Sequence, residues 1–153
     1  MASPLTLLRE YVTVLKALLA GQSVTVDGRY VRLDRVQLDW PPQQHVPVLI
    51  GGIGPKTLQL AGEIGDGVIL DAQHKEGTLR DALGHVASGR PAVSETEFST
   101  VSFVACSADD ATRTVGPHLD AGVDTVVLQP VGTQDALTEL ITAAGDLAQR
   151  HVR

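Results

Sequence analysis

The sequence predicts an α/β fold built on a parallel sheet. From residue 46 onward, short continuous apolar runs alternate four times with segments in which apolar residues recur every three or four positions. The runs are typical of strands buried on both faces of a parallel sheet, and the periodic segments are typical of amphipathic helices that cover such a sheet. Right-handed crossovers join successive strands in this arrangement. We therefore expect residues 46–153 to form four strand–helix units.

A helix is expected at the beginning of the chain. Apolar residues recur at spacings of three and four from Leu5 to Leu19. Ser3 is placed to cap the helix, Pro4 falls on the first helical position, and Gly21 follows the end. These start and stop signals agree with the periodicity.

A β-hairpin is expected next, because Asp27 and Gly28 separate two alternating runs within VTVDGRYVRL. An Asp-Gly pair favours a type I′ turn, whose two central residues take positive φ. The polar stretch from Asp39 to Gln44 contains two prolines and predicts an extended connector. We expect Tyr30 and Trp40 to pack the hairpin and connector against the body, with partner binding as the alternative for an exposed aromatic ring.

The four predicted strands are Pro47–Ile50, Gly67–Leu70, Val101–Cys106 and Thr125–Leu128. Capping residues support the helices that follow the last two strands: Ser107 is followed by Asp110, and Thr133 by Asp135. We expect a single domain over residues 1–153. Residues 1–45 would supply the helix, hairpin and connector, and residues 46–153 the four strand–helix units.

Composition limits the classes of function. The chain has 153 residues, of which 43% are hydrophobic, and a formal net charge of −6. The 12 basic residues are scattered, which argues against a general nucleic-acid surface. Its single cysteine, Cys106, cannot form an internal disulfide and is expected to pack in the core. With no apolar run of about 20 residues and no secretory signal pattern, we expect a cytoplasmic protein.

The segment VLIGGIGPKT, from Val48 to Thr57, is the most informative for function. A buried strand ends in a glycine-rich turn, and a helix starts at Pro55, so free N–H groups and the positive end of the helix dipole face the same point. An anion, above all a phosphate, is the expected ligand, although the glycines could serve only to form the turn. Lys56 and Thr57 could add a charge and a hydroxyl. The spacing is neither a Walker A loop nor a GxGxxG fingerprint.

Polar residues also follow two other predicted strands. Asp71, Gln73 and His74 follow the second strand and are candidates for the substrate side of a site at the carboxyl ends of the strands. His74 could act as an acid or base, with a solvated loop histidine as the alternative. Gln129 ends the last strand and could contact a cofactor ring or phosphate, or only close the strand. No metal-ligand spacing is present, and no catalytic residue is identified. Asp66, before the second strand, is expected to form a turn on the opposite edge.

The segment PVLIGGIGPKTLQLAGEIGDGVIL resembles a block found in luciferase-like monooxygenases, particularly the deazaflavin (coenzyme F420)-dependent members. The likeness extends to the leading helix, the DGRYVRLD hairpin, the Pro-Pro connector and the GVDTVVLQPVG strand. It implies the C-terminal half of a (β/α)8 TIM barrel that holds a flavin or deazaflavin at the carboxyl ends of its strands. By this resemblance, the backbone of Gly51, Gly52, Ile53 and Gly54 would hold the cofactor phosphate, flanked by Lys56 and Thr57.

The resemblance implies an F420- or FMN-dependent oxidoreductase or monooxygenase. The GIGPK sequence favours F420 over FMN. A composition with nine Arg, three Lys and no Asn, which is typical of GC-rich genomes, also favours F420. A noncatalytic phosphate- or cofactor-binding module, or a truncated remnant, is the alternative function.

Four strand–helix units cannot close a barrel, because the inner face and both edges of the sheet would stay open. We therefore expect a homodimer, or a partner chain that supplies the other half-barrel. A truncated product with an open sheet is the third possibility.

Overall fold

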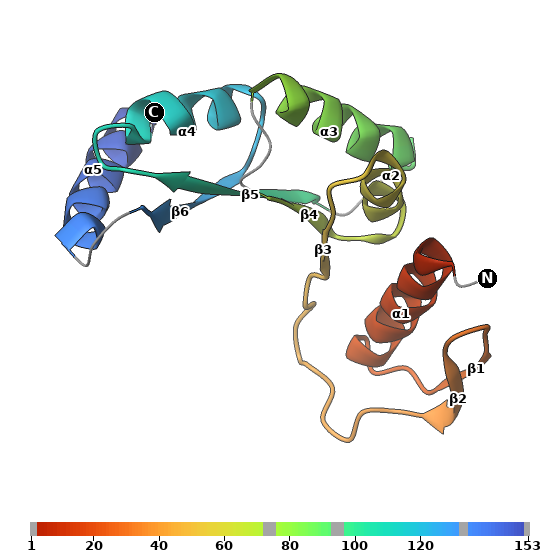
Figure 1. Ribbon diagram of the computed structural model, residues 1–153. Helices are drawn as coiled ribbons and strands as arrows, with labels where there is room; N and C mark the ends of the chain where they lie inside the picture. Colours follow the sequence, from red (N-terminus) through yellow and green to blue (C-terminus); the bar gives the residue numbers. More distant parts are fainter. Residues whose placement is uncertain (1–2, 72–75, 93–96, 132–134, 152–153) are drawn as a thin grey trace.

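The computed structural model describes residues 3–71, 76–92, 97–131 and 135–151. A helix and a hairpin precede four strand–helix units, and the helices arch over one face of a curved sheet (Figure 1). The elements are α1 (Pro4–Leu19), β1 (Val24–Asp27), β2 (Arg32–Val36), β3 (Leu49–Gly51), α2 (Pro55–Ile64), β4 (Gly67–Leu70), α3 (Glu76–Gly89), β5 (Ser99–Cys106), α4 (Ala111–Asp120), β6 (Thr125–Pro130) and α5 (Asp135–His151). No helix in these described ranges is long and apolar enough to cross a membrane.

The predicted α/β class is confirmed, with a parallel sheet in the order β3-β4-β5-β6. Each strand pairs with the strand before it in sequence, as strand–helix repeats require. The strands are somewhat longer or shifted relative to the prediction: β5 begins at Ser99 and β6 continues to Pro130. The helix after β5 begins at Ala111 with Asp110 as its N-cap, so Ser107 lies in the turn before it. Thr133 lies outside the described residues.

The core lies between the sheet and its helices. Its larger cluster joins Val68 and Leu70 of β4 to Leu58 of α2 and Leu79 of α3. A second cluster joins β5 to α4 and α5 and includes Cys106, which is 4% exposed. Burial, with a smaller contribution from the Asp110 carboxylate, raises the pKa of the Cys106 thiol. The expectation that this cysteine packs in the core is therefore confirmed.

The opposite, concave face of the sheet is only half-buried. Along β5, the side chains alternate between buried positions and more accessible ones such as Val101 and Phe103. In the parallel register, Val101 lies beside Ile69 of β4, and Phe103 beside Val127 of β6. The prediction that these strands are buried on both faces is therefore wrong for the described residues, because helices cover one face only.

A carboxylate shapes the hairpin turn. The predicted two-residue type I′ turn is wrong: Asp27 pairs with Arg32, which leaves a four-residue loop. Glu10 of α1 accepts hydrogen bonds from the backbone N–H groups of Arg29, Tyr30 and Val31, at 2.7–3.0 Å. The Tyr30 N–H above all, with those of Val31 and Arg29, holds the pKa of the Glu10 carboxyl below its usual range. The loop therefore wraps around a side chain of the preceding helix.

The two aromatic side chains that were expected to anchor the first 45 residues differ. The Tyr30 hydroxyl accepts a hydrogen bond from the backbone N–H of Ser3, so Tyr30 fastens the hairpin to the start of α1. Trp40 in the extended connector is 89% exposed, and its expected packing against the body is wrong for the described residues. An indole that finds no apolar neighbour within its reach remains in solvent.

Asp66 joins three segments at the amino-terminal edge of the sheet. Its carboxylate accepts hydrogen bonds from Lys16 Nζ at 2.6 Å and from the Val48 N–H at 2.9 Å. Its backbone also exchanges hydrogen bonds with the neighbouring strand segments. Asp124, before β6, makes a similar interaction: its carboxylate accepts a hydrogen bond from the backbone N–H of Thr100 at 2.7 Å. The residue expected only to form a turn thus ties α1 to the sheet.

The environment of Asp66 lowers its pKa. Burial alone would raise the pKa of this carboxyl, but the Lys16 ammonium and the Val48 N–H outweigh burial, with a smaller contribution from His45. A carboxyl whose pKa is lower in the folded protein stabilises the fold above its unfolded pKa of about 3.9. This contribution is lost as the pH falls through the lowered, folded-state pKa.

Replacement of Asp66 with asparagine should therefore lower the free energy of unfolding by about 1–3 kcal/mol at neutral pH, because it removes the charged partner of Lys16. The difference from the unmodified chain should shrink as the pH falls below about 4. Denaturant unfolding at several pH values would measure both effects. As a control, Asp34→Asn removes a highly exposed partner of Arg35 and should change stability by less than about 0.5 kcal/mol. Equal effects of the two substitutions would contradict the assignment.

Candidate functional site

The glycine-rich turn lies where β3 passes into α2, at the carboxyl-terminal edge of the sheet. Gly54 is the N-cap of α2, in an extended conformation, and has no side chain to satisfy the helix end. Its carbonyl oxygen accepts the N–H groups of Thr57 and Leu58, each at 3.0 Å. Pro55 occupies the first helical position and has no N–H to donate. The strand-to-helix turn was therefore correctly predicted from sequence.

Unsatisfied N–H groups gather at this turn. Within the described residues, the backbone N–H groups of Ile53, Gly54 and Lys56 have no main-chain or side-chain acceptor. They lie at the positive end of the α2 dipole, where an anion is stabilised. The Lys56 side chain is exposed in the first turn of α2. The geometry of the turn thus suits a phosphate group.

The glycines have different functions in the turn. A side chain at Gly52 would place its Cβ 2.6 Å from the methyl group of Thr57, so this position is closed by packing. A Cβ at Gly51 or Gly54 would meet nothing within 4 Å. Thr57 is half-buried, which agrees with a packing contact to Gly52. The open space over Gly51 and Gly54 is available to a ligand.

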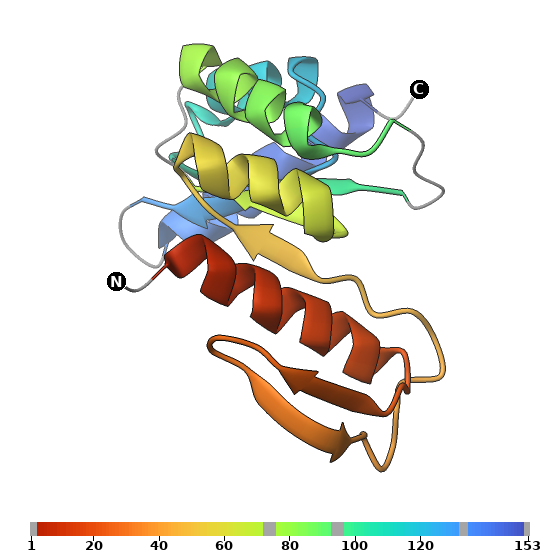
Figure 2. The same cartoon turned by 90° about the vertical axis from the view of Figure 1, so that its right-hand side faces the viewer.

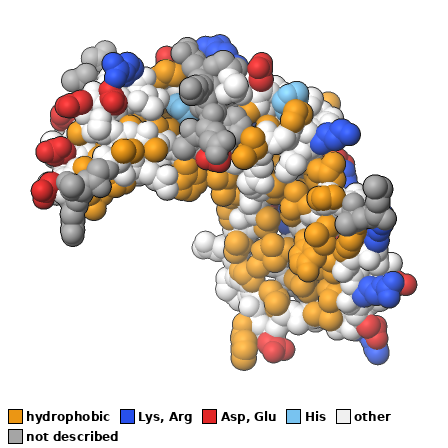
Figure 3. Space-filling model, in the orientation of Figure 1, with side chains coloured by type: hydrophobic (Ala, Val, Ile, Leu, Met, Phe, Trp, Pro, Cys, Tyr) orange, Lys and Arg blue, Asp and Glu red, His pale blue; other side chains and the backbone are white. Residues whose placement is uncertain are grey.

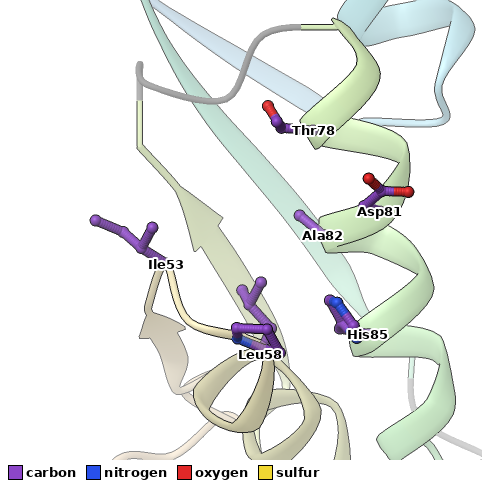
Figure 4. Close-up of a pocket in the computed structure, with 7 residues that line it drawn as sticks. Ile53, Leu58, Thr78, Asp81, Ala82 and His85 are labelled. Carbon is purple, nitrogen blue, oxygen red and sulfur yellow. The ribbon is translucent and has the colours of Figure 1, made fainter.

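Helix α2 separates two grooves. A polar groove of about 430 Å³ between α1 and α2 includes Lys56 and the pair Arg9–Glu63, whose two hydrogen bonds are both 2.6 Å long. A second groove, of about 280 Å³, runs between α2 and α3 and begins at Ile53. Figure 4 shows that Asp81 and His85 border it from α3, over a floor that includes Leu58. Ile53 is 57% exposed, so its side chain is accessible to a ligand at the turn.

The remaining predicted site residues fall at the same edge of the sheet or outside the described residues. Gln129 of β6 is exposed and lies beside Ala105, in alternation with Leu128, which packs under the helices. It therefore lies on the concave face near the carboxyl end. β3 and β6 are three strand spacings apart, about 14 Å along the sheet, so Gln129 lies well away from the glycine turn. Asp71 follows β4 and is half-buried. Gln73 and His74 lie outside the described residues.

Histidines in the described ranges do not form a metal centre. No group of three or more His, Cys, Asp or Glu residues there could hold a metal ion. His118 is buried between α4 and β5, where its Nδ1 lies 2.9 Å from the Ser102 hydroxyl. This pair was not anticipated from sequence, because Ser102 and His118 belong to elements whose facing sides only the fold reveals. Its place beneath a helix makes it part of the core.

Comparison with known proteins shows which family this chain resembles. The family model of luciferase-like monooxygenases matches residues 1–147. A 5,10-methylenetetrahydromethanopterin reductase from Archaeoglobus fulgidus is 33% identical in an alignment of 144 residues that covers 88% of this chain and 43% of the relative. The same enzyme from Methanolobus tindarius is 30% identical in an alignment of 142 residues that covers 87% of this chain and 43% of that protein. An F420-dependent glucose-6-phosphate dehydrogenase from Nakamurella multipartita is 36% identical over 76 residues, 50% of this chain and 22% of its own length.

This chain thus spans less than half the length of these curated relatives. Among solved structures, the coenzyme F420-dependent tetrahydromethanopterin reductase from Methanopyrus kandleri matches with a TM-score of 0.71 at 18% identity. The match covers 93% of this chain and 62% of that structure. The fold is therefore that of a partial TIM barrel, as predicted.

The contact between Gly52 and Thr57 can be tested by substitution. Gly52→Ala should destabilise the protein by about 1–3 kcal/mol, because the new methyl group overlaps Thr57 Cγ2. Thr57→Ser removes Cγ2, so adding it to Gly52→Ala should recover at least half of the loss. Denaturant unfolding of the two single variants and the double variant would measure the coupling. Gly54→Ala, whose methyl group enters open space, is the control; a loss as large as that of Gly52→Ala would refute the contact.

Proposed function

This chain belongs to the luciferase-like monooxygenase family, and on that basis we propose that it is the cofactor-phosphate-binding half of an F420-dependent oxidoreductase. The observation that carries the proposal is the turn from Gly51 to Gly54, with free N–H groups beneath open space at a helix N-terminus. Relatives named for F420 include both a dehydrogenase and a reductase. F420 is therefore favoured over FMN as the cofactor.

The residues of the turn fit a phosphate monoester or diester. The N–H groups of Ile53, Gly54 and Lys56 would donate hydrogen bonds to its oxygens, and the Lys56 ammonium would contribute charge. Thr57 would act through its packing against Gly52, with its hydroxyl as a further donor. The bound deazaflavin would supply hydride transfer, and this chain would hold and orient it.

Gln129 would contact a different part of the cofactor or the substrate. It lies at the carboxyl end of the concave face, about three strand spacings from the turn. Asp71 follows β4, between these two points, and would lie on the substrate side, as would Gln73 and His74 of the following segment. These assignments follow from the rule that the carboxyl ends of barrel strands carry the active site.

The reaction would require a closed barrel. The concave face carries half-buried apolar side chains, including Ile69, Phe103 and Val127, which are suited to the interior of a barrel. A second copy of this chain or the other half of a barrel could cover this face. Closure would also remove water from the space between the glycine turn and Gln129.

The phosphate site can be tested at Gly54 with two substitutions of nearly equal shape. Aspartate and asparagine both cap helices well, and either would partly cover the same N–H groups, so their difference isolates charge. Gly54→Asp should weaken F420 binding at least tenfold more than Gly54→Asn, because its carboxylate faces the phosphate. Titration of F420, followed by its fluorescence, would give both dissociation constants. Position 54 is preferable to position 52, where any side chain overlaps Thr57.

FMN and inorganic phosphate complete this experiment. Phosphate should compete with F420 for the unmodified chain, and FMN should bind more weakly than F420. Failure to bind F420 at millimolar concentration would overturn the proposal. Equal affinities of the Asp and Asn variants would place the phosphate elsewhere. Tight binding without turnover in a closed barrel would instead favour a noncatalytic binding module.

A further inference from the structure

Helices α2 and α3 pack against each other more extensively than any other two helices in the described ranges. They lie side by side over the sheet (Figure 2), and both run from its carboxyl-terminal edge toward its amino-terminal edge. The helix that begins at the glycine turn therefore has α3 as its main neighbour in the helical layer. The contact between these two helices affects where the turn lies.

Two glycines let the backbones of α2 and α3 approach closely. A Cβ at Gly62 of α2 would lie 2.1 Å from the carbonyl oxygen of Val86, and a Cβ at Gly89 of α3 would lie 1.9 Å from that of Gln59. The two contacts are reciprocal, because each helix places a glycine against a main-chain carbonyl group of the other. Neither glycine has a positive φ. The close approach of the backbones, and not a left-handed conformation, therefore requires glycine at both positions.

This close contact lies away from the glycine turn. Gln59 is near the middle of α2 and Gly62 is in its last turn, whereas Val86 and Gly89 are in the last turn of α3. Between the first halves of the two helices lies the groove of about 280 Å³ that begins at Ile53 (Figure 4). α2 and α3 are thus joined near the amino-terminal edge of the sheet, and space remains between them near the turn.

Other contacts hold both helices at the amino-terminal edge. Lys16 of α1 donates a hydrogen bond of 3.2 Å to the carbonyl oxygen of Ile64 at the end of α2. The guanidinium of Arg90, directly after α3, lies 4.8 Å from the centre of the Phe98 ring. α1 lies against α2 on the side away from α3, and hydrophobic side chains gather over this leg of the arch (Figure 3). At this end, α2 cannot move away from α3 without disturbing its contacts with α1.

We infer that Gly62 and Gly89 are positioning residues for the phosphate site at the start of α2. They act through the axis of α2, because the close contact sets how this helix lies beside α3. Gly62 is eight residues from Gly54, about 12 Å along the helix, so it does not itself touch a phosphate at the turn. The inference rests on the proposed function, since the donors that it positions are the N–H groups of the turn.

A side chain at either glycine would displace the first turn of α2. A methyl group at Gly62 or Gly89 would force the two backbones apart by more than 1 Å. Because α1 backs α2 at the amino-terminal edge and the free space lies at the opposite end, α2 would change its tilt. Donors of a binding site must lie within roughly 0.5 Å of their productive positions. The N–H groups of Ile53, Gly54 and Lys56 move with the first turn and would leave that range.

Gly62→Ala and Gly89→Ala test this inference, with Gly84→Ala of α3 as the matched control. Each substitution adds one methyl group to this pair of helices, but at Gly84 the methyl group meets nothing within 4 Å. Inorganic phosphate is the probe, titrated into the full 153-residue chain and followed by the amide signals of the turn in NMR spectra. Each of the first two substitutions should weaken phosphate binding by about fivefold or more, and the control should leave it unchanged.

A second measurement separates displacement of the turn from loss of stability. A variant that is only destabilised loses affinity because part of it is unfolded, and sucrose, which favours the folded state, should restore its affinity. With the turn displaced, phosphate binding should stay weak in sucrose while circular dichroism shows a folded chain. Without phosphate, the amide signals of the turn should be shifted in Gly62→Ala and Gly89→Ala and unshifted in Gly84→Ala.

The inference would be overturned if phosphate affinity were unchanged in both variants or recovered in sucrose. It would also be overturned if both variants stayed unfolded in sucrose, because the glycine contacts would then maintain the fold itself. An unmodified chain that binds no phosphate, together with shifted turn signals in the two variants, would contradict only the proposed function. Normal phosphate binding with unshifted signals in both variants would contradict only this inference.

Discussion

The carboxylate of Asp66 is the interaction on which the position of the first helix depends. It lies at the amino-terminal edge of the sheet and binds Lys16 of α1 and the N–H before β3 at once. Because a buried carboxylate requires partners, this one constrains the ends of three segments that are far apart in sequence. Asp124 performs a related function between β5 and β6. Two carboxylates thus join neighbouring segments at the amino-terminal edge of the sheet.

The carboxyl-terminal edge of the sheet, in contrast, carries backbone groups without partners among the described residues. At the carboxyl end of β3, donors are left without acceptors and space is left without side chains. Such an edge can bind a ligand because the amino-terminal edge holds the strands in register without its help. This division is typical of parallel α/β barrels. It explains how one short strand–helix turn can remain open while the surrounding helices are well packed.

Much of this arrangement follows from sequence because local signals determine it. The periodicity of α1, the glycine turn before α2 and the alternation of strands with helices each arise within a few residues. The four-residue hairpin loop could not be predicted, because it depends on Glu10, nearly twenty residues away, in place of the Asp27–Gly28 pair. The exposure of Trp40 also depends on what lies next to it in space. The position of the glycine turn follows from the sequence. That a side chain would overlap Thr57 at position 52 but meet open space at position 54 follows only from the structure.

The missing side chain at the N-cap of α2 has a consequence for folding as well as for binding. A serine or aspartate at position 54 would accept hydrogen bonds from the N–H groups of the first turn and would stabilise the helix by roughly a few tenths of a kcal/mol relative to glycine. A bound anion would supply the acceptors that a capping side chain supplies in other helices. Occupancy of the turn and order in the first turn of α2 are then linked equilibria. A ligand bound there would act as a removable cap, and the first turn of the helix would be most ordered with that ligand in place.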